Sequence, residues 1–270
     1  MSDLASLDTA TVLGRAERLA QEDPQRESEE RWSIVVELHH RGGSPVYQAA
    51  KGWCDSPNSL LRCLGADVLG QLGFSAGYPF AEASTPTLMG LLSDPDPPVV
   101  ESALVALGHL KTGDLPTVCA LMSHASAEVR HAVAFCLGGR DEELAVQTLV
   151  RLSKDDEARV RDWATFALGA LSTVDTSMLR DALVERLSDS DGDVRGEAMR
   201  GLALRKDMRA AGAILEELQR PGGSDLAIDA VSEMPRNEFL PLLEALLASN
   251  PDAENVSLAI AECRRATRAV

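Results

Sequence analysis

The segment at residues 155–171, DDEARVRDWATFALGAL, recurs with substitutions in three other places along the chain. The four copies align without gaps, and each contains one valine at the same position, which we call the anchor. They occupy residues 94–110, 123–139, 155–171 and 189–205, with anchors Val99, Val129, Val160 and Val194. The anchors are 30, 31 and 34 residues apart, and a period of this length is typical of repeat proteins.

Apolar residues in each copy follow the period of an α-helix. The fourth residue after the anchor is small or β-branched, and the eighth is leucine, so both lie on the anchor's side of a helix. These residues are Ala103, Val133, Ala164 and Ala198, followed by Leu107, Leu137, Leu168 and Leu202. We expect the small residue to let another helix approach closely. Three copies continue with Gly108, Gly138 or Gly169, which we expect to cap the helix with a positive φ.

A weaker helical pattern precedes each copy, so each repeat is predicted to be two helices joined by a short acidic turn. One such hairpin cannot bury its apolar surface alone, but stacked neighbours can. The pattern extends to anchors at Leu61, Leu226 and Val256, whereas Trp32, Val36 and His40 match the spacing poorly. We predict an all-α fold, an α–α superhelix of about eight helical hairpins.

The predicted organisation is one continuous domain with three parts. Residues 1–55 are expected to form an N-terminal helical cap of degenerate repeats, 56–205 the core repeats, and 206–270 degenerate repeats and a C-terminal cap. Residues 74–86 are expected to be irregular, and Pro221–Gly223 to interrupt a hairpin.

The repeat resembles the HEAT repeat family, in particular the short bacterial HEAT-like repeats also seen in phycobilisome lyases. The family's pattern of Asp, Val-Arg, a small residue and Leu-Gly is matched by Asp155, Val160-Arg161, Ala164 and Leu168-Gly169. The resemblance implies a solenoid fold. It covers residues 56–205 well and the remainder loosely, and it implies little about function.

An arginine directly follows four of the anchors: Arg62, Arg130, Arg161 and Arg195. These arginines could form a stripe that binds phosphate or carboxylate groups. The interpretation we favour is a structural ladder that pairs each arginine with an acid of a nearby turn, such as Asp155 or Asp191.

The composition argues against several classes of partner. The chain has 42 acidic and 26 basic residues, a formal net charge of −16 and a sequence pI near 4.7. Nucleic acids and anionic membranes call for clustered cations, so neither is expected as a partner. The sequence contains no apolar run long enough to span a membrane and begins without a secretory signal pattern, so we expect a cytoplasmic bacterial protein.

No motif predicts catalysis, a metal or a cofactor. Cys119, His124, His131 and Cys136 are close in sequence but fit no zinc spacing. The acidic run at residues 189–193 lacks the glycine and glutamate that a calcium loop requires. Phosphate-binding, dinucleotide-binding and nucleophile-elbow motifs are absent from the sequence.

The working surface is expected on the second helix of each hairpin. Residues two and six after the anchor should point away from the buried stripe, and the first series is Cys63, Glu101, His131, Asp162 and Gly196. The second series is Asp67, Val105, Phe135, Phe166 and Arg200. Phe135, Phe166 and Trp163 could form an aromatic ridge with a charged surround, or could pack between repeats.

We therefore expect a non-enzymatic interaction module without a cofactor, which binds a basic protein or peptide. The candidate contact residues are Glu101, His131, Phe135, Asp162, Trp163, Phe166 and Arg200. Acidity would suit an immunity or inhibitor protein, or an adaptor. The alternative is a lyase-like or chaperone-lyase accessory protein that acts on a cofactor-modified protein.

Overall fold

The computed structural model describes residues 4–220 and 224–268, and these residues form sixteen α-helices and no strand. The predicted all-α fold is confirmed. The helices pair in chain order into eight hairpins, which fall into two compact units, Met1–Cys136 and Leu137–Val270. The interruption expected at Pro221–Gly223 lies outside the described residues.

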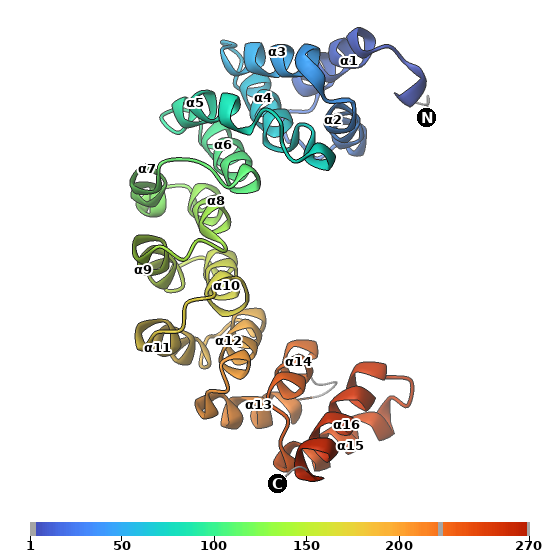
Figure 1. Ribbon diagram of the computed structural model, residues 1–270, viewed down its shortest axis with the longest axis vertical. Helices are drawn as coiled ribbons and strands as arrows, with labels where there is room; N and C mark the ends of the chain where they lie inside the picture. Colours follow the sequence, from blue (N-terminus) through green and yellow to red (C-terminus); the bar gives the residue numbers. More distant parts are fainter. Residues whose placement is uncertain (1–3, 221–223, 269–270) are drawn as a thin grey trace. The chain divides into compact units, whose positions relative to one another are not determined.

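Unit 1 contains four hairpins. The second helices of two consecutive hairpins, α4 and α6, pack against each other (Figure 1). Its helices are α1 (Thr9–Glu22), α2 (Glu29–Arg41), α3 (Gly43–Cys54), α4 (Ser59–Gln71), α5 (Ala81–Leu91), α6 (Pro97–Leu110), α7 (Leu115–Ala120) and α8 (Ala127–Leu137). Side-chain caps begin several of them, because Asp8, Asn58 and Asp114 accept hydrogen bonds from backbone N–H groups of the first turn.

Unit 2 also contains four hairpins, and its second helices α10, α12, α14 and α16 pack in that order. Its helices are α9 (Glu143–Leu152), α10 (Ala158–Phe166), α11 (Ser177–Arg186), α12 (Gly192–Leu204), α13 (Ala211–Leu218), α14 (Asp225–Glu233), α15 (Leu240–Ser249) and α16 (Glu254–Arg268). Helix α10 continues directly into a π-helical turn, η4 (Ala167–Leu171). Figure 1 shows α9 and α11 on one side of unit 2 and α10 and α12 on the other.

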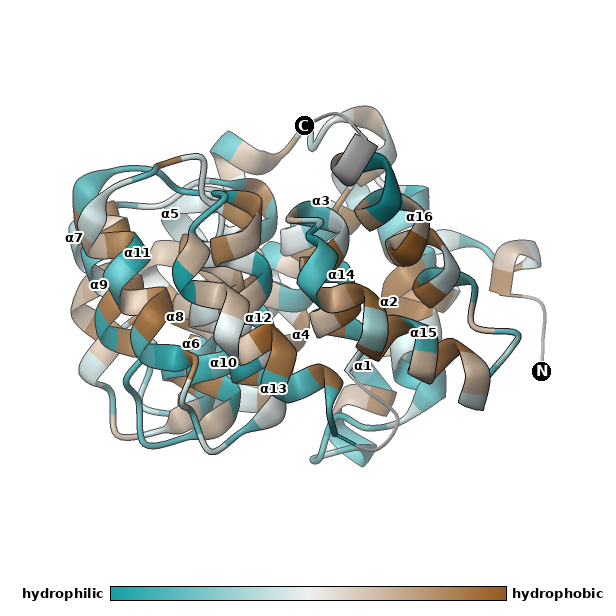
Figure 2. Cartoon of the chain, turned by 90° about the horizontal axis from the view of Figure 1, so that it is seen from below, coloured by the Kyte–Doolittle hydropathy of each residue, from teal (hydrophilic) through white to brown (hydrophobic). Residues whose placement is uncertain are grey.

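The anchors form the buried stripe that the spacing predicts. Val99, Val129, Val160 and Val194 are each 0% exposed, as are the leucines eight residues later. Figure 2 shows hydrophobic and hydrophilic residues mixed along the helices and not gathered in separate segments. Burial of these aliphatic side chains between hairpins is the main stabilising contribution, since each side chain removed from water contributes about 1.5–3 kcal/mol.

The first hairpin follows the repeat in a register different from the one expected. Trp32 and Val36 are 43% and 48% exposed, whereas Arg31, Val35 and His39 are buried. Arg31 therefore occupies the anchor position, 30 residues before Leu61, which explains why the register that begins at Trp32 matches the spacing poorly. The stripe was hard to recognise because two of its three positions hold polar residues.

The glycines expected to cap helices have another role. Gly108 lies inside α6, Gly169 lies inside η4, and neither has a positive φ. A Cβ built on Gly108 would lie 3.1 Å from the Cα of Cys136 in α8, and one on Gly169 would lie 3.0 Å from the Cα of Gly201 in α12. For Gly108 and Gly169 the capping prediction is wrong, because at these positions neighbouring second helices meet, whereas Gly138 directly follows the last residue of α8.

Another glycine fulfils the close-approach prediction. Gly65 lies four residues after Leu61, and a Cβ there would be 2.6 Å from the carbonyl oxygen of Ala50 in α3. The two helices of this hairpin therefore touch backbone to backbone, which a larger side chain would prevent.

The stretch expected to be irregular is partly helical. Residues 74–80 contain a short 3-10 turn and two glycines with positive φ flank it, at Gly73 and Gly77. Helix α5 then begins at Ala81 and contains Pro86. The proline therefore lies within the helix instead of marking the end of the loop.

Two further properties concern the whole described chain. Among the described residues, no helix has both the length and the apolar character needed to cross a membrane. All five cysteines are buried, and burial raises the pKa of the Cys54 thiol to about 12.

Candidate functional site

The arginine after each anchor binds the turn that precedes its own helix. In all four cases Nη1 donates to two consecutive backbone carbonyls, at 2.9–3.2 Å. The acceptors are Ser56 and Pro57 for Arg62, His124 and Ala125 for Arg130, Asp155 and Asp156 for Arg161, and Asp189 and Ser190 for Arg195. Each arginine thus ties its helix to the turn that precedes it.

Arg62 and Arg161 also bind a carboxylate in the turn of the next hairpin. Arg62 donates Nε and Nη2 to the two carboxylate oxygens of Asp94 at 2.6 and 2.9 Å, and Arg161 binds Asp189 in the same way at 2.9 and 2.8 Å. Burial opposes ionisation of both acids, but the guanidinium groups lower the pKa values of both. Arg195 instead pairs with Glu217 at 3.3 Å.

Asp191 accepts the backbone N–H groups of Asp193 and Val194 and so caps α12. Asp94 and Asp189, which bind the preceding hairpin's arginine, lie five residues before their anchors. Asp155 occupies the same position before Val160 and, like them, accepts the backbone N–H of the residue two positions later. Where Val100 replaces the arginine, the corresponding residue of the next turn is His124, which accepts the N–H of Ser126.

Arginines from the first hairpin cover the second-helix face of unit 1. Arg26 donates to the Glu101 carboxylate at 2.9 Å and to the Ser102 hydroxyl at 2.6 Å, both on α6. Arg31 donates to Asp67 on α4 at 2.7 Å. Glu101 is therefore paired within the chain, and Cys63, expected to face outward, is 1% exposed.

Phe135 packs against the neighbouring hairpin. Its ring lies 5.1 Å from that of His109, edge to face, and fills the space that a Cβ on Gly108 would enter. Phe135 and His131 are both half-buried on α8. Phe135 therefore packs between repeats, which is one of the two alternatives that the sequence leaves open.

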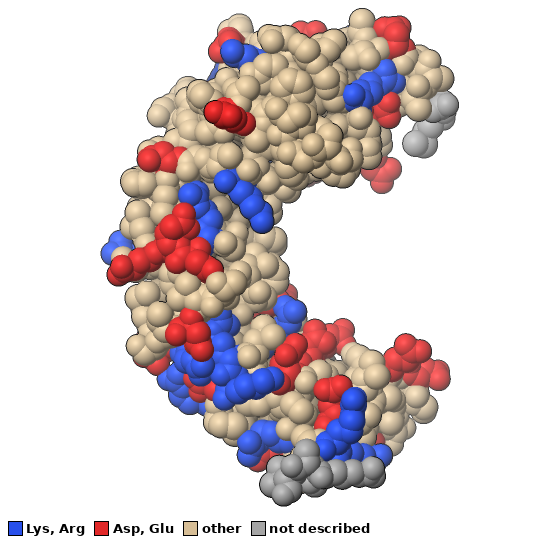
Figure 3. All heavy atoms as spheres, in the orientation of Figure 1, with Lys and Arg blue, Asp and Glu red and all other residues tan. Residues whose placement is uncertain are grey.

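Four carboxylates gather on the second helices of unit 2, and we call them the acidic face. They are Asp162 of α10, Asp193 and Glu197 of α12, and Asp229 of α14. Their charges are coupled, because Asp162, Asp193 and Asp229 all raise the pKa of Glu197. Figure 3 shows acidic side chains gathered over α12 and α14.

Two members of the acidic face are only partly solvated. Burial raises the pKa of Asp162 to about 6, with smaller contributions from Asp193 and Asp191. Burial likewise raises the pKa of Glu197 to about 7, although Arg200 opposes the rise. Among the described residues, neither carboxylate forms an ion pair or a hydrogen bond. No ion pair therefore neutralises either carboxylate within the described part of unit 2.

An aromatic pair adjoins the acidic face. The rings of Trp163 and Phe166 on α10 lie 5.4 Å apart with their planes at 59°, and both residues are half-buried. Arg200 on α12 is also half-buried. Gly196 is buried instead of facing outward, because the Leu226 side chain lies where its Cβ would be.

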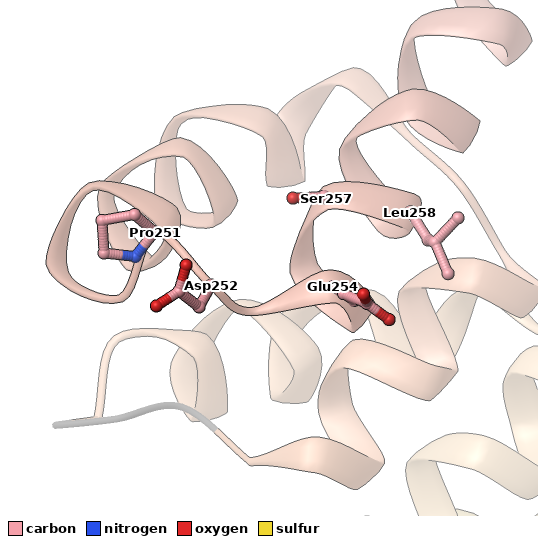
Figure 4. A pocket seen from close by; sticks show the side chains of 5 residues that line it. All are labelled: Pro251, Asp252, Glu254, Ser257 and Leu258. Atoms are coloured by element: carbon pink, nitrogen blue, oxygen red, sulfur yellow. The ribbon is translucent and has the colours of Figure 1, made fainter.

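A cavity of about 540 Å³ lies elsewhere in unit 2, at the turn between α15 and α16 (Figure 4). Pro251 and Asp252 of the turn line it together with Glu254, Ser257 and Leu258 of α16, and Leu258 is 63% exposed. None of the contact residues predicted from the sequence lines this cavity.

Arg205 is a structural residue that does not stand out in the repeat pattern of the sequence. Its guanidinium donates to five carbonyls, 2.6–3.3 Å away, and its side chain is 8% exposed. The acceptors are Leu168, Gly169, Ser172, Val174 and Gly201. It thus satisfies the carbonyls at the end of η4, which no helical N–H can reach. The sequence feature that could have identified Arg205 is its position eleven residues after the anchor Val194.

The histidines and cysteines do not assemble a metal site within the described residues. In that part of the chain, no group of three or more His, Cys, Asp or Glu side chains could hold a metal ion.

Comparison with known proteins supports the repeat assignment. Residues 115–183 match a family model of HEAT repeats. Protein YibA of Escherichia coli K12 is 29% identical over 249 residues, which cover 84% of this chain and 83% of YibA. An X-ray structure of E. coli YibA superposes with a TM-score of 0.71 at 26% identity and covers 96% of this chain and 98% of that one.

A crystal structure of importin beta is similar in fold alone. Its TM-score is 0.52 at 14% identity, and the match covers 96% of this chain and 41% of importin beta. The chain therefore carries HEAT repeats, matched directly over residues 115–183, and has the all-α fold of HEAT-repeat proteins.

Proposed function

We propose that this chain is a non-enzymatic interaction module and that the second-helix face of unit 2 binds a protein or peptide of basic character. The observation that carries the proposal is that Asp162 and Glu197, half-buried on the face that also holds the Trp163–Phe166 pair, form no ion pair among the described residues. Half-buried carboxylates without a cation destabilise the unbound protein, and a cationic partner would relieve that cost.

The aromatic pair gives this face an anchor for binding. Aromatic side chains contribute disproportionately to protein interfaces, because they bury a large area with few rotatable bonds. Negative charge around them accelerates encounter with a cationic partner. An acidic module that captures a basic protein would suit an immunity or inhibitor protein, or an adaptor.

Site-specific photo-crosslinking tests this proposal in the cells that produce the protein. A photoreactive phenylalanine analogue is placed at Phe166, and a matched control carries it at Gln147 of α9, which is half-buried like Phe166. We expect a discrete covalent adduct with one protein from position 166 and not from position 147. Equal labelling from both positions, or no adduct from position 166, would contradict the proposal.

A second experiment separates loss of binding from loss of folding. The double variant Trp163→Ser and Phe166→Ser should lose the captured protein, while its helical circular dichroism stays that of the wild type. Capture that survives the double substitution would show that the aromatic pair is not part of the interface.

A further inference from the structure

The first hairpin differs from the other repeats at three of their defining positions. Arg31 occupies the anchor position, and Trp32 follows it where four other hairpins have an arginine. Trp32 still makes the bond of that arginine, because its indole N–H donates at 3.0 Å to the carbonyl of Arg26, five residues before the anchor position. Arg62 and Arg161 bind the carbonyl at the same position of their own turns. The first hairpin is therefore a repeat with altered side chains.

The third difference is a reversed charge in the turn between α1 and α2. At the position five residues before the anchor, three other turns hold aspartate: Asp94, Asp155 and Asp189. The turn between α1 and α2 holds Arg26 there. Arg26 extends past the second hairpin to α6 of the third, where it donates to the Glu101 carboxylate at 2.9 Å and to the Ser102 hydroxyl at 2.6 Å. The altered residue thus joins two hairpins that are not neighbours in the repeat order.

Arg26 and Arg31 hold the first hairpin against the second-helix face of unit 1. Arg31 donates to Asp67 of α4 at 2.7 Å, and both α1 and α2 contact α4 (Figure 1). Cys63 lies one turn before Asp67 on the same side of α4 and is 1% exposed, whereas the equivalent residues of α6, α8 and α10 are half-buried. Burial raises the pKa of the Cys63 thiol, and the charges of Arg26 and Arg31 oppose this rise. The first hairpin therefore covers Cys63 and Asp67.

The docked position of this hairpin has two unfavourable features. The Arg31 side chain is 2% exposed, but among the described residues its Nε and Nη1 have no hydrogen-bond acceptor. Burial of unpaired N–H donors is costly, and water would solvate these donors if the hairpin moved away. Arg26 has a φ of 59°, in the left-handed region that residues other than glycine seldom adopt. Both features favour release of the hairpin.

A glycine pair joins the hairpin to the rest of unit 1. Gly42 and Gly43, at the junction of α2 and α3, have φ values of 59° and 81°. The nearest non-neighbouring atom to a Cβ built on either glycine lies 3.7 Å away, so other atoms do not confine this junction. Glycine accepts a wide range of backbone angles, and the pair can therefore serve as a hinge.

We propose that the first hairpin is a hinged cover, which turns about the glycine pair and controls access to the second-helix face of α4 and α6. In the closed position the two arginines pair with Asp67 and Glu101 and hide Cys63. In the open position the two acids and the thiol reach solvent while the remaining helices of unit 1 stay folded. The proposal is independent of the function proposed for unit 2, and it adds a regulated surface in unit 1.

The buried thiol of Cys63 reports on opening of the cover. The full chain is treated with N-ethylmaleimide under native conditions, and peptide mass spectrometry measures the labelling rate of each cysteine. We expect Arg26→Ala to accelerate labelling of Cys63 about tenfold, because the closed position loses two hydrogen bonds. The rates at Cys119 of α7 and Cys263 of α16 should stay unchanged. Arg18→Ala removes an exposed arginine of α1 and should leave the Cys63 rate unchanged.

A second variant tests whether the buried ion pair favours release. The double variant Arg31→Met and Asp67→Leu replaces the pair with apolar side chains that require no hydrogen-bond partners. We expect the cover to close more tightly, so that labelling of Cys63 becomes about tenfold slower than in the wild type. Circular dichroism verifies that each variant keeps the helical content of the wild type.

The contrary outcomes are equally specific. An unchanged Cys63 rate in Arg26→Ala would show that Arg26 does not hold the hairpin closed and would overturn the proposal. Equal acceleration at all five cysteines would overturn it as well, because the hairpin would then open only with the whole fold. Faster labelling of Cys63 in the double variant would show that the ion pair stabilises the closed position, which contradicts a cover that is poised to open.

Discussion

Arg161 donates two hydrogen bonds to the carboxylate of Asp189, from Nε at 2.9 Å and from Nη2 at 2.8 Å. This ion pair joins the turns of two consecutive hairpins. The Arg161 side chain is 13% exposed and that of Asp189 is 6% exposed, so solvent screens the pair only weakly. The same arginine holds its own turn through Nη1.

Arg161→Ala should therefore lower the free energy of unfolding by about 3–5 kcal/mol, since it leaves a buried carboxylate and two carbonyls without their donor. Urea denaturation followed by circular dichroism measures this loss. Arg151→Ala, at an exposed position of α9, is the matched control and should change stability by less than about 0.5 kcal/mol. If Arg161→Ala were as stable as the wild type, the structural role of these arginines would be contradicted and the ligand-binding interpretation would be favoured.

Gly201→Ala should destabilise unit 2 by about 1–3 kcal/mol, because a Cβ on Gly201 would lie 2.5 Å from the Cα of Gly169. Gly212→Ala is the control, since a Cβ there meets nothing within 4 Å and alanine favours the helix by about 1 kcal/mol. Thermal unfolding of the two variants measures the difference. If Gly201→Ala were as stable as Gly212→Ala, the close contact between η4 and α12 would be refuted.

The sequence predicted the repeated part of the fold because Val99, Val129, Val160 and Val194 are apolar and evenly spaced. It missed the register of the first hairpin because Arg31 takes the place of an anchor valine. A polar residue at an anchor carries no periodic apolar signal, and its burial depends on Asp67, 36 residues away in the chain. Local pattern alone does not reveal such a partner.

The prediction that Gly108 and Gly169 cap their helices is wrong for a related reason. A helix cap and a close contact between helices both require a residue without Cβ, so Gly108 and Gly169 are compatible with either in sequence. The candidate interaction residues likewise have sequence positions that are compatible with more than one role. The spacing placed Glu101 and Asp162 at equivalent positions, but only the structure distinguishes Glu101, which Arg26 covers, from Asp162.

Glu197→Gln should make the protein more stable at alkaline pH. The pKa of Glu197 rises in the folded state from 4.5 to about 7, so the folded protein keeps a proton that the unfolded chain releases. The contribution of this residue to the free energy of unfolding is consequently lost as the pH rises from about 4.5 to about 7. The charges that face it are Asp162, Asp193, Asp229 and Arg200.

At pH 8 the expected gain from Glu197→Gln is on the order of 1 kcal/mol, after allowance for solvent screening of a half-exposed group. Urea denaturation at pH 5 and pH 8 measures it, with Glu143→Gln as control. A gain of equal size at both pH values, or no gain at pH 8, would contradict a raised pKa of Glu197 in the folded protein.

Arg205→Ala should lower the free energy of unfolding by about 3 kcal/mol or more, because five carbonyls lose their charged donor. Hydrogen exchange should accelerate at residues 167–174, where four of these acceptors lie. Arg205→Lys should recover only part of the loss, since an ammonium group has three donors and cannot span the same acceptors. Full recovery by lysine would show that charge alone matters at this position.

Carboxyl footprinting of the full chain with its crosslink-identified partner tests the interaction face most directly. Labelling of solvent-accessible Asp and Glu with glycine ethyl ester is quantified by mass spectrometry with and without the partner. Asp162, Asp193, Glu197 and Asp229 should become protected, while Glu143 of α9 and Glu185 of α11 remain labelled. Protection of Glu143 and Glu185, with the four acids of the acidic face still labelled, would contradict the account.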